Sequence, residues 1–241
     1  MELPLIQAHF GTFLLLVVSK LLLWEKTASI SACDTEEEGC MEYFVEETFT
    51  NANLLAKNIL KLTEQMHQEF LHNEFSSRHF AAFNAQLVKQ NQLILRARTY
   101  CHSTITNPPN IGPEYINIST KTYLKMLINF VGAWISPLYH LVTELSAMQD
   151  VPETILSKAK VIEENNRDLL SDLQLVLTKV YPTEKKPEVF PSWGHVSSIT
   201  SNDKDDKFLA IFNLSYCLRV DIYYTEFHIK SLKCRIIGKD C

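Results

Sequence analysis

The stretch that decides the fold reads VEETFTNANLLAKNILKLTEQMHQEF and covers residues 45–70. Its apolar side chains recur at steps of three and four residues, which places them on one face of an α-helix. This stripe comprises Val45, Phe49, Ala52, Leu55, Ile59, Leu62, Met66 and Phe70. We therefore predict a helix of roughly 30 residues that buries this face against other helices.

Two more stripes with the same period follow downstream. The second covers residues 124–145 and contains Pro137, which removes the hydrogen bond to the Ala133 carbonyl and so predicts a kink. The third covers residues 155–180 and includes one polar member, Asn166. Both stripes predict helices that face a shared core.

The last stripe covers residues 211–236. Asn202 or Asp203 is a plausible N-cap for this helix, because a side-chain oxygen there accepts from the first free backbone N–H groups. Gly238 is the expected stop, since glycine readily adopts the left-handed conformation that ends a helix. The chain thus carries four helices of bundle length.

The connections between the stripes indicate the topology. About five residues join the second and third helices, which makes them antiparallel neighbours, whereas about 45 residues follow the first helix and about 20 follow the third. We predict an all-α, four-helix bundle with up-up-down-down order and two long crossover connections. The first connection carries apolar residues spaced for short helical turns, namely Phe80, Phe83, Leu87, Leu93 and Leu95.

The N-terminus has the pattern of an export signal. Residues 11–24 read GTFLLLVVSKLLLW, an apolar run shorter than the roughly 20 residues that span a bilayer, and small residues follow it. We predict a signal peptide over residues 1–29, cleavage between Ala28 and Ala32, and one secreted domain over residues 30–241. We expect no later run to be long and apolar enough to insert in a membrane.

Six cysteines in an oxidising compartment usually form three disulfides. The positions are Cys33, Cys40, Cys101, Cys217, Cys234 and Cys241. The two terminal pairs each lie seven residues apart, which favours two small loops and one long bridge, although 15 pairings are possible in principle. None of the spacings is typical of a zinc ribbon or a thioredoxin-type redox site.

Composition excludes several classes of function. A net charge of −5 with only 6 glycines argues against a nucleic-acid-binding surface and against a glycine-rich nucleotide-binding fold. The 8 histidines form no zinc motif and no catalytic triad order. His67, His72 and His79 are expected to be solvated helix residues. We predict no enzyme activity, no cofactor and no metal site.

The outer side of the last helix is unusually aromatic. Opposite the core position Leu218, a turn of 100° per residue places Tyr216, Val220, Tyr223 and Phe227, with Arg219, Tyr224 and Lys230 beside them. Tyrosine, phenylalanine and arginine are typical anchors of protein interfaces. We expect Tyr223, Tyr224, Phe227 and Lys230 to bind a partner, while for Tyr216 and Val220 cover by the long connections is the competing interpretation.

Two sequons for N-glycosylation are present, Asn117-Ile-Ser119 and Asn213-Leu-Ser215. The first lies in a connection, where modification is easy. The second lies inside the last helix, where a glycan would stand on the proposed binding face. Both asparagines are candidate glycosylation sites.

Several stretches resemble the prolactin family. They are LYHLVTE at residues 138–144, PETILSKA at 152–159, PSW at 191–193, CLRVD at 217–221 and LKCRII at 232–237. Cys33 and Cys40 also resemble the small N-terminal loop that distinguishes prolactins from growth hormones. Residues 69–77, EFLHNEFSS, are similar to the placental prolactin-related proteins of rodents.

The resemblance implies a secreted, placental, long-chain cytokine-type hormone, expected to be a monomer. It implies disulfides Cys33–Cys40, Cys101–Cys217 and Cys234–Cys241. It also implies that single-pass receptors are brought together by two faces, the first built from helices one and four and the second from helices one and three.

The departures from the family pattern indicate a non-lactogenic member. The three histidines of the lactogenic first face align with Lys57, Leu60 and Tyr223, and the small glycine of the second face aligns with Asp172. These positions, with Arg219 and the aromatic residues of the last helix, are the candidate receptor-binding residues. The alternative is a heparan-type glycan-binding module that uses Lys230, Lys233, Arg235 and Lys239 beside Arg96 and Arg98.

Overall fold

The structure is a computed structural model that describes residues 38–89, 116–191, 196–239 and 241. Of these residues 81% are helical, and none of them forms a strand. The helices are α2 (Glu38–His72), α3 (Ser77–Lys89), α6 (Thr120–Gly132), α7 (Ile135–Ala147), α8 (Glu153–Val180), α9 (Val196–Ile199) and α10 (Lys204–Ile237). The chain divides into two compact units, Met1–Tyr43 and Phe44–Cys241, and all packing given below lies within the second.

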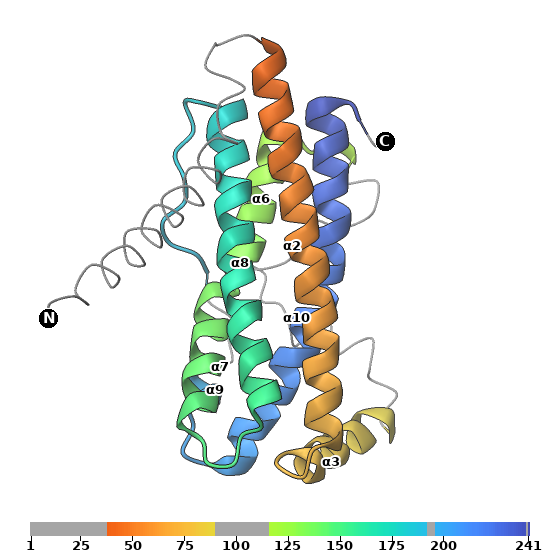
Figure 1. The fold of residues 1–241 in the computed structure, drawn as a ribbon, viewed down its shortest axis with the longest axis vertical. Coiled ribbons are helices and arrows are strands. Elements are labelled where there is room, and N and C mark those ends of the chain that lie inside the picture. Colours follow the sequence, from red (N-terminus) through yellow and green to blue (C-terminus); the bar gives the residue numbers. More distant parts are fainter. Residues whose placement is uncertain (1–37, 90–115, 192–195, 240) are drawn as a thin grey trace, which may run out of the picture. The chain divides into compact units, whose positions relative to one another are not determined.

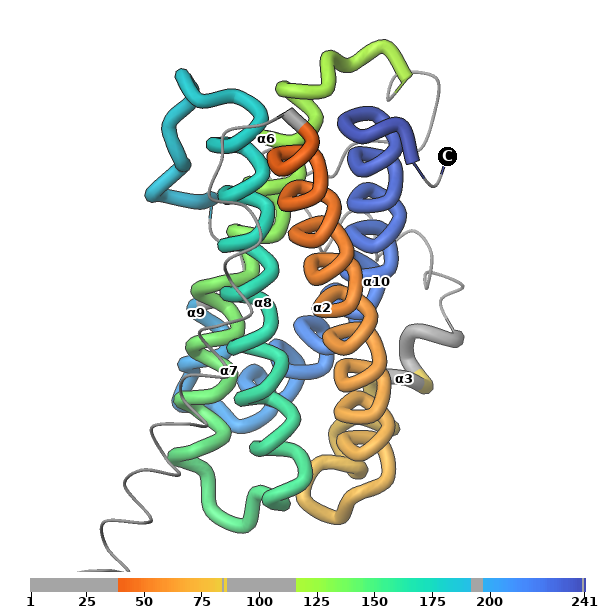
Figure 2. Tube along the Cα trace, turned by 45° about the horizontal axis from the view of Figure 1, so that its top comes forward, coloured from red at the N-terminus to blue at the C-terminus, as the bar shows by residue number. Residues whose placement is uncertain are grey.

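Within the second unit, four long elements form a bundle. Helix α2 and the α6–α7 pair run in one direction, and α8 and α10 run back in the other (Figure 1). Helix α8 packs against α6 and α7, and α10 packs against α6, α3 and α9. Helix α2 lies beside α8 and α10 in both views (Figures 1 and 2). The predicted four-helix bundle with up-up-down-down order is confirmed.

The predicted stripes line one core. On α2, Phe49, Ala52, Ile59, Met66 and Phe70 are all fully buried, while Leu55 and Leu62 are partly buried at its edge. The other stripes contribute their apolar positions to the same cluster. The hydrophobic spacing therefore selected the buried face of each helix correctly.

The second stripe forms two helices with a break at Ala133 and Trp134. The break lies one turn before Pro137, where the proline cannot donate to the Ala133 carbonyl. The Trp134 N–H bonds instead to the Val131 carbonyl at 3.2 Å. The buried amide of Asn166 donates to that same carbonyl at 3.4 Å. The polar member of the third stripe thus forms a hydrogen bond to the backbone where the helix is interrupted. The predicted kink is confirmed.

Helix α10 begins and ends where its sequence predicts. The Asp203 carboxylate accepts from the N–H groups of Asp205 and Asp206, each at 2.9 Å. Gly238 ends the helix with φ of 77°, a left-handed conformation that costs glycine little. Both caps stabilise the ends of the longest element of the C-terminal half.

The first connection contributes a helix, α3, that packs on the beginning of α10. Phe80 of α3 is fully buried and lies edge-on to Phe212, with the ring centroids 5.1 Å apart. Phe83 also contacts Phe212, and the His79 ring stacks on Phe208. The expected helical turns at Phe80 and Phe83 are confirmed, whereas Leu93 and Leu95 lie outside the described residues.

One run in the described part of the chain has the length and composition to cross a membrane, which corrects the sequence expectation. It is Thr120–Ala147, which comprises α6 and α7. Of its most apolar 18-residue window, 56% is buried inside the bundle. Its apolar side chains, among them Leu124, Leu127 and Leu138, belong to the core, which explains why the run is so hydrophobic.

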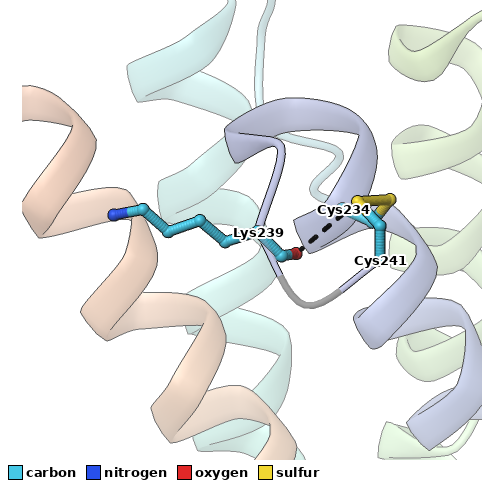
Figure 3. Close-up of a disulfide and its surroundings, with 3 residues drawn as sticks. All are labelled: Cys234, Lys239 and Cys241. Atoms are coloured by element: carbon cyan, nitrogen blue, oxygen red, sulfur yellow. Dashed lines mark hydrogen bonds between the residues drawn. A yellow bond between two sulfur atoms is a disulfide. The ribbon is translucent and has the colours of Figure 1, made fainter.

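The C-terminal disulfide links Cys234 to Cys241, with their Cα atoms 5.1 Å apart (Figure 3). This confirms one of the three pairings. Cys40 and Cys217 are also disulfide-bonded. Their proposed partners, Cys33 and Cys101, lie outside the described residues, as do the signal peptide and its cleavage site, so these assignments stay predictions.

Candidate functional site

Helix α10 changes character along its length. No side chain between residues 207 and 222 is exposed. Beyond that point Tyr223 is 63% exposed, Phe227 is 37% exposed and Lys230 is exposed. Positions three and four residues apart share a helix face, so these three side chains form one outward strip. We call Tyr223, Phe227 and Lys230 the aromatic strip.

The neighbours of the strip are partly buried. Tyr224 lies beside Tyr223, with ring centroids 5.8 Å apart. The Arg219 guanidinium lies over the ring of Tyr216 at 5.4 Å from its centroid, which is a cation–π contact. Tyr216 and Val220 are both half-buried. Of the aromatic side, Tyr223 and Phe227 are therefore exposed, whereas Tyr216, Val220 and Tyr224 are partly buried.

Helix α2 supplies the other side of this face. Two contacts fix the antiparallel register of α2 and α10: Lys239 Nζ lies 2.7 Å from Glu46 Oε2, and His67 Nδ1 lies 2.8 Å from Ser215 Oγ. By this register, Lys57 lies level with about Phe227 and Leu60 with about Tyr223 on the neighbouring helix. Lys57 is exposed, and Leu60 is partly buried against the core.

His67 is a buried residue, which corrects the expectation of a solvated helix histidine. Its side chain is packed against the rings of Phe80 and Phe212 and bonded to Ser215. Burial, together with the nearby Arg219 charge, lowers the pKa of His67 from 6.5 to about 4. The sequence missed this because the covering residue, Phe80, comes from the first connection. Of the other two, His72 is exposed as expected and His79 is partly buried.

A shallow depression of about 700 Å³ opens beside Arg219. Its lining consists of Glu64, Gln65, Gln68, Glu69, Lys158 and Arg219. Glu69 accepts from Lys158 Nζ at 2.6 Å and from Thr154 Oγ1 at 2.5 Å. Partial burial raises the pKa of Glu69, but these two bonds outweigh it and lower the pKa overall. The depression is thus polar and internally paired on its α8 side.

The second-face position, Asp172, is tied to helix α2. Asn51 Nδ2 donates to Asp172 Oδ2 at 2.8 Å, and the carboxylate is half-buried. Burial raises the pKa of Asp172, the Asn51 bond opposes that effect, and the like charge of Asp168 adds to it. Sequence reasoning found Asp172 but missed Asn51, because 121 residues separate them.

The cations of the glycan-binding alternative already have partners. Lys233 and Lys239 both pair with Glu46, at 3.8 and 2.7 Å, and Lys230 pairs with Glu226 at 2.7 Å. Arg235 donates to the Ile118 carbonyl at 2.9 Å and also lies over the Tyr123 ring. Arg96 and Arg98 lie outside the described residues. A sulfated glycan would have to displace these carboxylates, which leaves the alternative with little support.

Within the described part of the chain, no three His, Cys, Asp or Glu side chains are grouped to hold a metal ion. His228 is buried in the core, where its Nδ1 lies 2.5 Å from the Tyr123 hydroxyl. This hydrogen bond has a structural role. Trp134 Nε1 similarly donates to buried Asp221 at 3.0 Å.

Sequence comparisons agree with this architecture. The profile of the somatotropin hormone family matches residues 16–241. Prolactin-8A8 of Mus musculus is 54% identical over 242 aligned residues, and prolactin-8A4 of Rattus norvegicus is 53% identical over 242, each alignment covering 100% of both chains. Prolactin-7D1 of Mus musculus is 37% identical over 230 residues, which cover 95% of this chain and 93% of its own. The chain belongs to the somatotropin hormone family as a prolactin-like member, and is therefore a hormone and not an enzyme.

Proposed function

We propose that this protein is a secreted, monomeric, placental hormone that binds a single-pass cytokine-type receptor without acting as a lactogen. Its first receptor face consists of the aromatic strip with Arg219 and Tyr224 on α10, and of Lys57 and Leu60 on α2. Cleavage of the signal peptide near residue 29 releases the bundle, which does not insert in the membrane.

The exposure of Tyr223 and Phe227 is the observation that carries this proposal. Nearer its beginning the same helix buries Phe208 and Phe212 and covers Tyr216 in part. A bundle that leaves two adjacent aromatic groups in water loses the hydrophobic stabilisation of burying them. Such groups are typical anchors of a protein interface.

The non-lactogenic assignment is supported by the chemistry of two faces. On the first, a lysine, a leucine and a tyrosine cannot reproduce the three titratable imidazoles of lactogenic relatives or share a zinc ion. On the second, a close approach by another receptor would bury the Asp172 carboxylate further. That burial carries a desolvation cost unless the partner supplies a cation.

The test is a proliferation assay on cells whose only receptor of this type is the prolactin receptor. We expect no activation at concentrations where a prolactin standard is fully active. Potent activation at nanomolar concentration would contradict the non-lactogenic assignment.

Asp172→Gly should restore part of the activity if the side chain blocks the second face. Asp168→Gly is the matched control, because it places a glycine one turn earlier on the same helix, with a similar cost of about 1 kcal/mol in stability. A gain from Asp172→Gly alone supports the second-face explanation. Equal behaviour of the two variants would contradict it.

A further inference from the structure

From the different environments of the two sequons we infer that Asn117 carries the N-linked glycan and that Asn213 carries none, because Ser215 serves the fold rather than a modification. This inference rests on entry into the secretory pathway, which is part of the proposed function. It does not depend on the identity of the receptor.

The Asn117 sequon is presented to solvent. Asn117 is exposed, and it lies just before α6, whose N-cap is Ser119. Arg235 holds the intervening Ile118 by its carbonyl at 2.9 Å, which anchors the segment through its backbone and not through the asparagine amide. Ser119 is exposed as well and bonds only to Thr122, at 2.8 Å between the two hydroxyl oxygens. A bulky, hydrophilic glycan is suited to such a position.

The Asn213 sequon lies within α10, where Asn213 itself is partly buried between fully packed neighbours. Leu214 and Ser215 are both 0% exposed, and Phe212, on the other side of the asparagine, is 2% exposed. The Ser215 hydroxyl has two partners, His67 Nδ1 at 2.8 Å and the Phe212 carbonyl at 2.9 Å. A transferase must reach both the amide and the hydroxyl of a sequon. In the folded chain the Ser215 hydroxyl is buried and so out of its reach.

The chemistry of the modification is the same at either site. The Nδ2 nitrogen of the asparagine attacks the anomeric carbon of an oligosaccharide linked to a lipid pyrophosphate. The carbon–oxygen bond to the pyrophosphate breaks, the lipid pyrophosphate leaves with the electron pair, and the nitrogen loses one proton. Selection between the sites therefore comes from access during folding and not from reactivity.

Access at Asn213 closes when local structure forms. Asn213 lies one turn before Cys217, which is itself disulfide-bonded, and beside Phe212, on which α3 packs through Phe80 and Phe83. Helix formation, the bond of Ser215 to His67 and the disulfide each make this sequon less accessible to the transferase. Asn117 and Ser119 stay exposed in the folded chain, so folding does not compete with modification there.

The experiment is expression of the full chain in mammalian cells, followed by site mapping of the secreted protein. A glycosidase that converts a glycosylated asparagine into aspartate, used in heavy-oxygen water, marks each occupied position for mass spectrometry. We expect the mark at position 117 and at least tenfold less at position 213. Substantial marking at 213, or none at 117, would overturn the inference.

Two variants extend the test. Asn117→Gln should abolish the glycosidase-sensitive mobility shift, and Asn213→Gln should leave it unchanged. If Asn117→Gln is not secreted, the mapping of the unmodified chain decides alone. If the native leader fails to export the chain, replacing residues 1–29 with an unrelated leader tests occupancy, and that failure counts only against the proposed secretion.

A matched pair separates the structural role of Ser215 from its place in a sequon. Asn213→Gln and Ser215→Ala both delete the sequon, but only the second removes the partner of buried His67. We expect Ser215→Ala to lower the Tm by about 3 °C or more, and Asn213→Gln to leave it nearly unchanged. Equal Tm values for Ser215→Ala and the unmodified protein would contradict the structural explanation.

Discussion

The two halves of α10 differ in how far their aromatic side chains are buried. The first half packs on α3 through Phe208 and Phe212 and exposes no side chain from residue 207 to residue 222. The second half keeps a buried side, with Thr225, Ile229 and Leu232, but leaves the aromatic strip in solvent. Aromatic residues occur in both halves, so composition alone does not separate core from surface on this helix.

The difference supports the proposal that the first half of the helix mainly stabilises the bundle and that the second half binds a partner. In the first half the rings of Phe208 and Phe212 are packed by residues from α3. In the second half, the ring of Tyr223 contacts that of Tyr224, and the ring of Phe227 contacts that of His228. The largest and smallest effects of substitution should therefore lie on the same helix, a few turns apart.

The largest effect is expected at Phe212. Phe212→Ala should lower the free energy of unfolding by about 3–5 kcal/mol, because it leaves a cavity among Phe80, Phe83 and His67. Urea unfolding followed by circular dichroism measures the change. Phe227→Ala is the matched control and should cost well under half as much. Equal losses would show that both halves of α10 are core.

The next effect is the pH dependence that buried His67 creates. Its folded pKa of about 4 lies below the value of 6.5 expected in the unfolded chain, so the unfolded state binds more protons between these pH values. Stability contributed by neutral His67 is present above pH 6.5 and is lost as pH falls toward 4, by about 3 kcal/mol in total.

His67→Gln should remove this slope from the stability curve between pH 6.5 and 4. His72→Gln, at an exposed position of the same helix, is the control and should preserve it. The readout is urea unfolding repeated across that pH interval. A slope that survives His67→Gln would mean that other groups produce the acid sensitivity.

The smallest effects concern two ion pairs, one in each half of α10. Lys207 pairs with Glu144 at 2.5 Å, and both side chains are 19% exposed, whereas Lys230 pairs with Glu226 with 54% of the lysine exposed. Lys207→Ala should cost about 1 kcal/mol in stability and Lys230→Ala less than about 0.5 kcal/mol. A larger loss of stability from Lys230→Ala than from Lys207→Ala would contradict the view that the first half of α10 is the more tightly packed one.

Much of the bundle could be predicted because its signals are local. The spacing of Val45 through Phe70 selects a helix face, Pro137 interrupts a helix one turn upstream, and Asp203 and Gly238 mark helix ends through their own backbone and side-chain chemistry. None of these features needs knowledge of a distant residue. The C-terminal disulfide, with a separation of 7 residues, is local in the same sense.

The environment of individual side chains could not be predicted in the same way. Burial of His67 depends on Phe80, and the state of Asp172 depends on Asn51, a residue of another helix. Glu46 pairs with Lys239, 193 residues away, a contact that the sequence alone does not reveal. Periodicity identifies which face is apolar, but the partner that covers or neutralises a residue is set by the tertiary packing.

The central claim, that the exposed half of α10 binds a partner, is tested most directly by cell binding of Tyr223→Ala and Phe227→Ala with the Tm measured in parallel. Each variant should weaken binding by about 1–3 kcal/mol, roughly 5- to 150-fold, while the Tm stays within a few degrees of the unmodified protein. Tyr139→Ala, a 58% exposed tyrosine on α7, is the control and should bind normally. Unchanged binding per folded molecule, or a collapse of the Tm, would contradict the claim.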